Sequence, residues 1–438
     1  MVDCVKVGLL FIIGSDKNGG GLYKMELMIS TICLTGAAIF GIVIHRQFFR
    51  HVASNYISPI LGIIIALVPA LNHLVATFHS EVFMEMIVAP LLFYDGMETR
   101  FNKVARNFRV IISLTVCMAI LCAMAAGFGL AATGMVSLPL AFVLAAISTP
   151  TDATASEAVA HDLVIPDTEN SYLKLESLFN DATGIILLNM AVLWYINGYI
   201  NYGQTVANFV YSAVVGAVFG FIGGTVIILV RQALIRSHIN LVNTANTTVT
   251  PSKVIFLATP FVIYFLVEHL QVSGIIAVVC TGILHNAEME RSNLLNPRII
   301  YDTQELIGMI KEVFNGIVFV VLGIMMVRIT RDNGMVAHPQ RWVLLGVIMY
   351  IANVIVTWAI RRLNVKSASI FAFGGVHGTV TFALAFMVAE TAVKKSDFNL
   401  VLMAEAVLIM LSLLVPTFLF RFLLERKPSD RVISRKTI

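Results

Sequence analysis

The chain has 438 residues, of which 58% are hydrophobic and 13% are charged, whereas about a quarter of the residues of an average soluble domain carry charge. This composition excludes a soluble globular protein and indicates an integral membrane protein. The formal net charge of +4 follows from basic residues in the loops between apolar segments, so it indicates no nucleic-acid partner.

Apolar segments that are long enough to cross about 30 Å of hydrocarbon as helices recur along the whole chain. Residues 1–24 precede them and are predicted to form an N-terminal arm. A short basic tail, residues 425–438, follows the last segment. We predict thirteen membrane helices, over residues 25–44, 57–78, 82–98, 109–132, 138–160, 172–198, 206–234, 253–269, 273–287, 306–327, 342–361, 367–389 and 399–424.

An odd number of helices allows two six-helix units to flank one linker helix, 206–234, and to lie upside down relative to each other. Inverted-repeat transporters build their sites from paired broken helices, and the fifth helix of each unit is interrupted here. Helix 5 contains "STPTDATAS", in which Pro150 removes a backbone donor. Helix 12 contains "FGGVHGTVT", in which Gly374, Gly375 and Gly378 weaken the helix. The sequence therefore predicts an all-α polytopic membrane protein with two inverted six-helix repeats and broken helices 5 and 12.

Lysine and arginine are more frequent in one set of alternate loops, which includes the C-terminal tail. Cytoplasmic loops near helix ends retain positive charge. The chain is therefore predicted to be a multi-pass protein of the cell membrane, with its N-terminus outside and its C-terminus in the cytoplasm.

Polar side chains converge on helix 6, in the segment "ESLFNDATGI". Ser177 and Asp181 are four residues apart, as are Glu176 and Asn180, so the two pairs lie on adjoining strips of one helix face. Asp181 lies about 15 Å into this helix, near the membrane midplane. An ionisable residue at this depth is costly and usually serves function.

Asp152 and the carbonyl group of Thr151, which follow the break in helix 5, can point towards the same place. Hard cations prefer such oxygen ligands, so these residues predict a monovalent cation site. Residue patterns alone leave alternatives open. Asp152 and Asp181 could cap helix ends, and Ser177 and Asn180 could form hydrogen bonds between helices. Glu176, which lies near Lys174, could belong to an interfacial ion pair.

The segments "STPTDAT", "ESLFNDATGI" and "GGVHGTVTFALAF", in this order, resemble those of the monovalent cation:proton antiporter superfamily. The resemblance is to its NhaP-type branch, which includes the animal sodium/proton exchangers. It implies that Asp181 carries both the cation and the proton, that Thr151, Asp152 and Ser177 complete the cation site, and that Asn180 supports it. The pair Asn180–Asp181 implies electroneutral exchange, and no cofactor is expected beyond the transported Na⁺ and H⁺.

The resemblance also implies a homodimer in the lipid bilayer and an elevator-type movement. Core helices 4–6 (109–198) and 11–13 (342–424) would move against scaffold helices 1–3 (25–98) and 8–10 (253–327). Potassium is the alternative cation, and a cation channel or an intramembrane aspartyl protease is the alternative class. The chain lacks the Gly-x-Gly-Asp sequence of such proteases, and a single carboxylate cluster between broken helices suits alternating access better than a pore.

One position departs from the family pattern. His377 stands where relatives carry an arginine that pairs with the glutamate of "ESLFND", here Glu176. Histidine titrates near pH 6.5, so a Glu176–His377 pair would respond to pH; the alternative is a neutral, helix-bonding histidine. Asp95 is predicted to pair with Arg100, and lining an inner funnel is the alternative. Lys311 is predicted to reach the cytoplasmic interface or to pair with neighbours of Glu312, and a proton-carrier role is the alternative.

Overall fold

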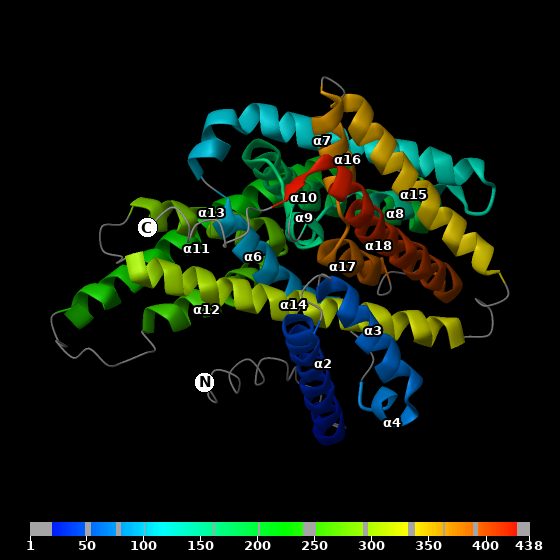
Figure 1. The fold of residues 1–438 in the computed structure, drawn as a ribbon. Coiled ribbons are helices and arrows are strands. Elements are labelled where there is room, and N and C mark those ends of the chain that lie inside the picture. The colour runs from blue at the N-terminus through cyan, green and yellow to red at the C-terminus, as the bar shows by residue number, and fades with distance from the viewer. Residues whose placement is uncertain are drawn as a thin grey trace, which may run out of the picture.

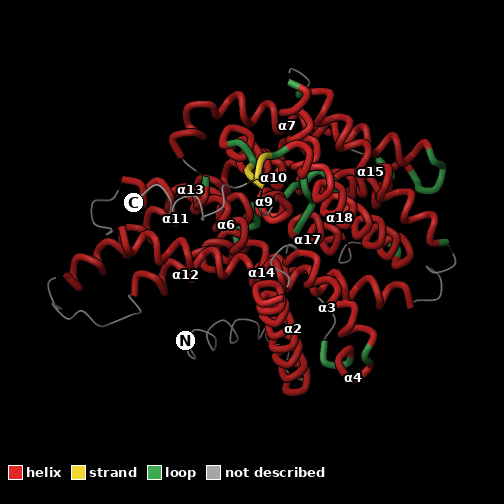
Figure 2. Tube along the Cα trace, viewed as in Figure 1, coloured by secondary structure: helices red, strands yellow, loops and turns green. Residues whose placement is uncertain are grey.

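The computed structural model describes residues 20–48, 54–75, 80–99, 101–160, 163–199, 202–239, 251–291, 297–331, 338–361, 364–388 and 393–426. Most of the predicted N-terminal arm and the tail beyond residue 426 lie outside these residues. Within them the chain is almost wholly helical, as the red tube of Figure 2 shows. The described helices are α2 (Gly20–Phe48), α3 (Ser54–Leu67), α4 (Pro69–Asn72), α5 (Ser80–Phe83), α6 (Ala89–Glu98), α7 (Phe101–Ala132), α8 (Leu138–Ile147), α9 (Ala153–Ala160), α10 (Asp167–Asn197), α11 (Tyr202–Ile239), α12 (Pro251–His269), α13 (Gly274–Arg291), α14 (Pro297–Arg331), α15 (Pro339–Ile360), α16 (Val365–Gly374), α17 (Thr379–Met387) and α18 (Lys395–Leu423).

The prediction of an all-helical, multi-span membrane protein is confirmed. Seven described helices are long and apolar enough to cross a membrane, and α16 and α17 together make an eighth candidate, bent by 47°. Each of the thirteen predicted ranges contains helix. Range 82–98 also contains a wider π-helical turn, Met84–Val88. It ends two residues before Pro90, which has no N–H to donate to the carbonyl of Met86.

Both predicted interruptions are present. Helix α8 ends at Ile147 and α9 begins at Ala153, so Pro150 lies in the extended segment between them. Helix α16 ends at Gly374 and α17 begins at Thr379, and the intervening residues are also non-helical. Each broken range is therefore two short helices joined by a few extended residues.

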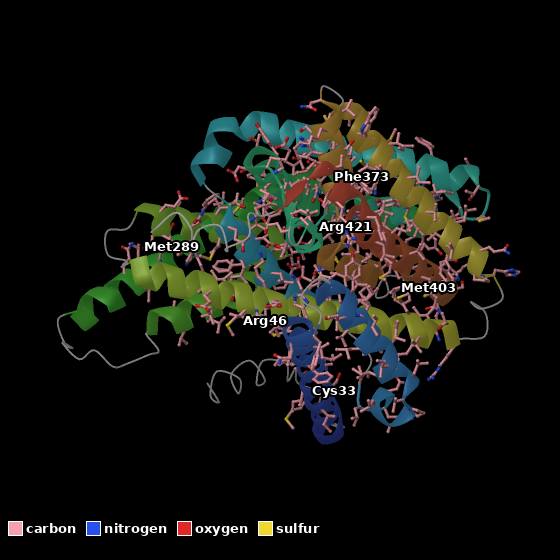
Figure 3. The ribbon with its side chains drawn as sticks, viewed as in Figure 1. Cys33, Arg46, Met289, Phe373, Met403 and Arg421 are labelled. Carbon is pink, nitrogen blue, oxygen red and sulfur yellow. The ribbon has the colours of Figure 1, made fainter. Side chains whose placement is uncertain are left out.

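The helices pack in two groups (Figure 1). In the first helix group α14 lies along α3 and α2, and α13 lies along α6, α11 and α12. In the second, α15 packs against α7 and α18, and α10 against α7 and α8. Helix α2 projects from the rest of the molecule; Figure 3 shows Arg46 at its end next to α14, where Arg46 Nη2 lies 2.6 Å from Glu312 Oε2.

Reciprocal glycine contacts hold the first group together. A methyl group at Gly62 of α3 would collide with the carbonyl of Val320 on α14, and one at Gly323 of α14 with the carbonyl of Pro59 on α3. Helices α6 and α13 meet in the same way through Gly96 and Gly282. Small residues let membrane helices approach closely and gain van der Waals contact, so these two crossings fix the geometry of the group.

A short antiparallel strand pair joins two distant parts of the second group. Strand β1 (Leu163–Val164), between α9 and α10, pairs with β2 (Glu425–Arg426), which follows α18. It is the yellow segment near α10 in Figure 2. The pair ties the end of α18 to the connection between α9 and α10.

Candidate functional site

The two extended segments of the broken helices cross and are hydrogen-bonded to each other. The backbone N–H of Asp152 donates to Val376 O at 2.6 Å. Pro150 O accepts from His377 Nδ1 at 2.7 Å and from Thr381 Oγ1 at 3.0 Å. Non-helical backbone within a membrane persists only where its polar groups are satisfied, and here each segment satisfies the other.

Helix α10 packs against the first extended segment. Ser177 Oγ donates to Thr151 O at 2.6 Å, and Asn180 Nδ2 donates to Thr151 Oγ1 at 2.7 Å. A Cβ atom at Gly184 would lie 2.6 Å from Pro150 Cγ, so only glycine lets α10 approach the break this closely. The serine and the asparagine of "ESLFND" thus hold Thr151 in place.

A cavity of about 10 Å³, the front cavity, brings together four of the predicted site residues: Thr151, Asp152, Ser177 and Asp181. Asp181 is 3% exposed, and its Oδ1 atom has no hydrogen-bond partner. Asp152 Oδ1 accepts from the N–H of Ala155 at 3.0 Å. Asp152 is therefore both a cap of α9 and a neighbour of Asp181, whereas Asp181 caps no helix end.

The other side of the front cavity comes from the first helix group, and most of these residues were not predicted. Asp95 of α6 lines the cavity with Lys311 and Asn315 of α14. Lys311 Nζ lies 2.6 Å from Asp95 Oδ1 and 3.0 Å from Glu98 Oε1. Lys311 is 4% exposed, so it pairs with these two acids instead of extending its charge into solvent. Arg100, the predicted partner of Asp95, lies outside the described residues.

Asn180, Glu176 and His377 face a second cavity of about 30 Å³, the rear cavity, behind the extended segments. Here the predicted Glu176–His377 pair is not formed. Glu176 Oε2 accepts from Arg361 Nη2 at 2.6 Å, and the Arg361 guanidinium carbon lies 3.8 Å from the centre of the Phe371 ring. His377 instead donates to Pro150 and lies 3.5 Å from Asn353 Nδ2.

The sequence contained a signal for this arginine. Arg361 is the last residue of the predicted range 342–361, and it follows α15 directly. Its position at the end of an apolar range is typical of a cytoplasmic loop charge, yet its long side chain reaches back to α10. The glutamate of "ESLFND" therefore has an arginine partner, which follows α15 and does not come from the break in helix 12.

The donor set of the front cavity suits a small monovalent cation. It combines carboxylate, hydroxyl and carbonyl oxygens, the ligand types that hard cations prefer. In the part of the chain that the structure describes, no group of three or more His, Cys, Asp and Glu side chains has the arrangement of a metal site. Asp152 and Asp181, with Thr151 and Ser177, present such oxygens to the front cavity.

Comparison with known proteins decides the family. Residues 34–426 match the model of the transmembrane region of sodium/hydrogen exchangers. The chain belongs to the sodium/hydrogen exchanger family. This is a family of transporters rather than enzymes, which removes the protease alternative.

Several proteins with similar sequences are named as antiporters. The chain is 27% identical to a sodium, potassium, lithium and rubidium/H⁺ antiporter of Bacillus pumilus over 94% of its own length and 64% of that protein's. It is 27% identical to the antiporter of the same name from Bacillus subtilis, of which it spans 61%. It is 24% identical to the Na⁺/H⁺ antiporter ApNhaP of Aphanothece halophytica, over 78% of this chain and 64% of that one. The chain thus spans less than two thirds of these relatives.

The fold is that of a solved antiporter. The sodium proton antiporter MjNhaP1 of Methanocaldococcus jannaschii superimposes with a TM-score of 0.65 and 18% identity, over 90% of this chain and 100% of that one. The sodium/hydrogen exchanger family and an NhaP-like fold are therefore established on separate grounds, sequence and structure.

Proposed function

We propose that this protein exchanges a monovalent cation for a proton across the membrane, with Asp181 as the shared carrier. The observation that carries the proposal is the buried Oδ1 atom of Asp181, which has no partner and faces a cavity with Asp152, Thr151 and Ser177. A buried charge without a partner is costly. Asp181 therefore requires a proton or a cation before the site moves through hydrocarbon, and this requirement couples the two fluxes.

Sodium is the proposed cation and potassium the alternative. The names of the relatives include both ions, and both are hard cations that accept carboxylate, hydroxyl and carbonyl ligands. One carboxylate that is neutralised by one proton or one cation moves no net charge in a cycle. We therefore propose electroneutral exchange of one cation for one proton, with Asn180 supporting Thr151 rather than carrying charge.

The proposed architecture has thirteen membrane crossings in two inverted six-helix repeats. Two features support the repeats: both fifth helices are broken, and the α3–α14 and α6–α13 crossings are made by matching glycine pairs. In an inverted repeat, α3 and α6, the second and third helices of the first unit, correspond to α13 and α14, the second and third helices of the other unit. The α3–α14 crossing therefore corresponds to the α13–α6 crossing.

The two helix groups support a division into a scaffold and a moving core. The first group would be the scaffold (25–98 and 253–327) and the second the core (109–198 and 342–424), with the linker 206–234 beside the scaffold. The scaffold would form the homodimer, and the core would carry Asp181 past it. The N-terminus would lie outside and the C-terminus in the cytoplasm, so the Asp167 end of α10 would face the cytoplasm.

The test is exchange in proteoliposomes that contain an entrapped pH dye. Imposing an outward proton gradient and then adding Na⁺, K⁺, Li⁺ or Rb⁺ should produce dequenching only with transported ions. Choline is the control cation. Absence of any cation-dependent proton movement, or a single-channel conductance in planar bilayers, would contradict antiport.

A further inference from the structure

A lysine on α10 lies between two glutamates that belong to different helix groups. Lys174 Nζ is 2.9 Å from Glu157 Oε1 on α9 and 3.6 Å from Glu98 Oε2 on α6. Glu98 has a second partner in its own group, since its Oε1 atom accepts from Lys311 Nζ at 3.0 Å. Two lysines, one from each group, therefore share Glu98 across the seam between the groups.

This lysine stands at one end of a third cavity, the side cavity, of about 20 Å³. Lys174 and Asp181 both line it, together with Glu98, Asp95 and Ser177. Asp181 comes seven residues after Lys174, which is about two helical turns or 10 Å along the axis, so both side chains lie on one face of α10. The cavity has room for about one water molecule, too little for a hydrated ion. Lys174 lies nearer the Asp167 end of α10 than Asp181 does, and it shares the side cavity with Asp181 and Glu98.

The contact between Lys174 and Glu98, which joins the two helix groups, can break at a low cost in free energy. It is the longest of the contacts made by these two lysines, and both of its partners are partly exposed, at 29% for Lys174 and 39% for Glu98. When the seam opens, Lys174 keeps Glu157 and Glu98 keeps Lys311. No charge is left without a partner, and leaving one is the main cost of breaking a buried ion pair.

We propose that Lys174 controls the entry of cations to Asp181 from the Asp167 side of α10. Its ammonium group closes the side cavity on Glu98 and withdraws to Glu157 alone when a cation enters. Lys174 is thus a positioning residue of the proposed antiport, on which this inference rests. Its positive charge also repels the entering cation, so it raises the cation concentration needed on that side.

The first test is the side-specific KM for Na⁺ in oriented proteoliposomes. Lys174→Gln should lower the KM on the Asp167 side roughly three- to tenfold, the effect of one charge about 10 Å away, and leave the KM on the opposite side unchanged. Lys174→Arg keeps the charge and should retain the wild-type KM. Lys366→Gln is the matched control, because Lys366 is exposed at the start of α16 and lines none of the three cavities. An unchanged KM in Lys174→Gln, or an equal change on both sides, would overturn the proposal.

The second test uses cross-links, with the native cysteines replaced. Lys174→Cys with Glu98→Cys, joined by a short bis-thiosulfonate that forms a disulfide with each cysteine and releases sulfinate, should stop exchange until a reductant cleaves the disulfides. The control is Lys174→Cys with Glu157→Cys, because both positions belong to the same helix group. The same link between these two cysteines should not stop exchange. Continued exchange in the linked 174/98 protein would show that the seam does not open there. Wild-type vesicles separate the hypothesis of antiport from that of the entry role of Lys174. If wild-type vesicles show no exchange, antiport itself is wrong. If they exchange and the variants behave like wild type, only the entry role is refuted.

Discussion

Asp181 and Asn180 are adjacent in sequence but face different cavities. Consecutive residues of a helix point about 100° apart, and the extended segment around Thr151 lies between the front and rear cavities, so Asp181 faces one and Asn180 the other. The amide of Asn180 holds Thr151 and lines no part of the front cavity. We therefore propose that Asn180 positions Thr151, the supporting role that the family resemblance implies.

Replacement of Asp181 tests the carrier. Asp181→Asn keeps the shape of the side chain but removes the group that binds a proton or a cation in turn, so cation-driven proton flux should fall below a tenth of the wild-type rate. Flux is measured by dye dequenching, and thermal unfolding of the purified protein reports folding. Asp167→Asn, the same change at an exposed position at the start of α10, should retain full flux. A variant at position 181 that keeps more than a tenth of the rate would remove Asp181 from this role.

His377 is expected to act through hydrogen bonds rather than through charge. Its Nδ1–H donates to Pro150 O and it is 2% exposed; Glu176 already has Arg361. Exchange rates of wild type and His377→Gln, normalised and measured from about pH 6 to 8, the range in which histidine usually titrates, should superimpose. His377→Leu removes the donor to a buried carbonyl, which costs about 1–3 kcal/mol, and should melt at a lower temperature than His377→Gln. A pH profile that flattens in the glutamine variant would restore a titrating role.

The sequence was sufficient for the residues that local rules control. Spacing of four placed Ser177 and Asp181 on one strip of a helix, and Pro150 placed Asp152 beside a break. Asp95 and Lys311 were noted from the sequence, but their place beside Asp181, together with Asn315, could not be predicted in this way, because these residues come from α6 and α14. Which of their faces meets the front cavity depends on how the two helix groups pack, and no local pattern encodes that packing.

At the scale of elements, the glycine crossings set how closely helices approach. The contact at Gly62 is with backbone rather than with a flexible side-chain end, so an added methyl group can be accommodated only if α3 moves away from α14. Gly62→Ala should therefore lower the melting temperature by several degrees, consistent with about 1–3 kcal/mol for overpacking. Gly308→Ala is the control, since nothing lies within 4 Å of a Cβ at that position of α14. Equal melting temperatures for the two variants would mean that the α3–α14 crossing is loose.

The broken helices could be predicted because proline and glycine act on their own backbone. Their mutual hydrogen bonds could not, since Asp152 and Val376 are more than two hundred residues apart in the chain. Helix ends were predicted least well. Range 57–78 was expected to be one helix, yet α3 ends at Leu67, before Pro69 begins α4.

At the scale of the whole molecule, exchange through one carboxylate should be insensitive to voltage. A net charge moved in each cycle would contribute about 2.3 kcal/mol per 100 mV. Proteoliposomes clamped with valinomycin and K⁺ gradients, assayed with Na⁺, should reach the same equilibrium Na⁺ gradient at 0 and at about 100 mV. Protonophore-treated vesicles serve as the control for leak. A reversal point that shifts with voltage would indicate a second carrier, and Lys311 with Asp95, which line the same cavity as Asp181, would be the first residues to examine.

The crossing of the extended segments has a consequence for hydrogen–deuterium exchange. Amides outside helices and strands usually exchange quickly because they open to solvent at little cost. The Asp152 amide instead donates to Val376 O, and it can open only when the two broken helices separate. Its exchange should therefore be as slow as that of amides in the middle of α10, and faster exchange on adding Na⁺ would show that the crossing loosens as the ion binds.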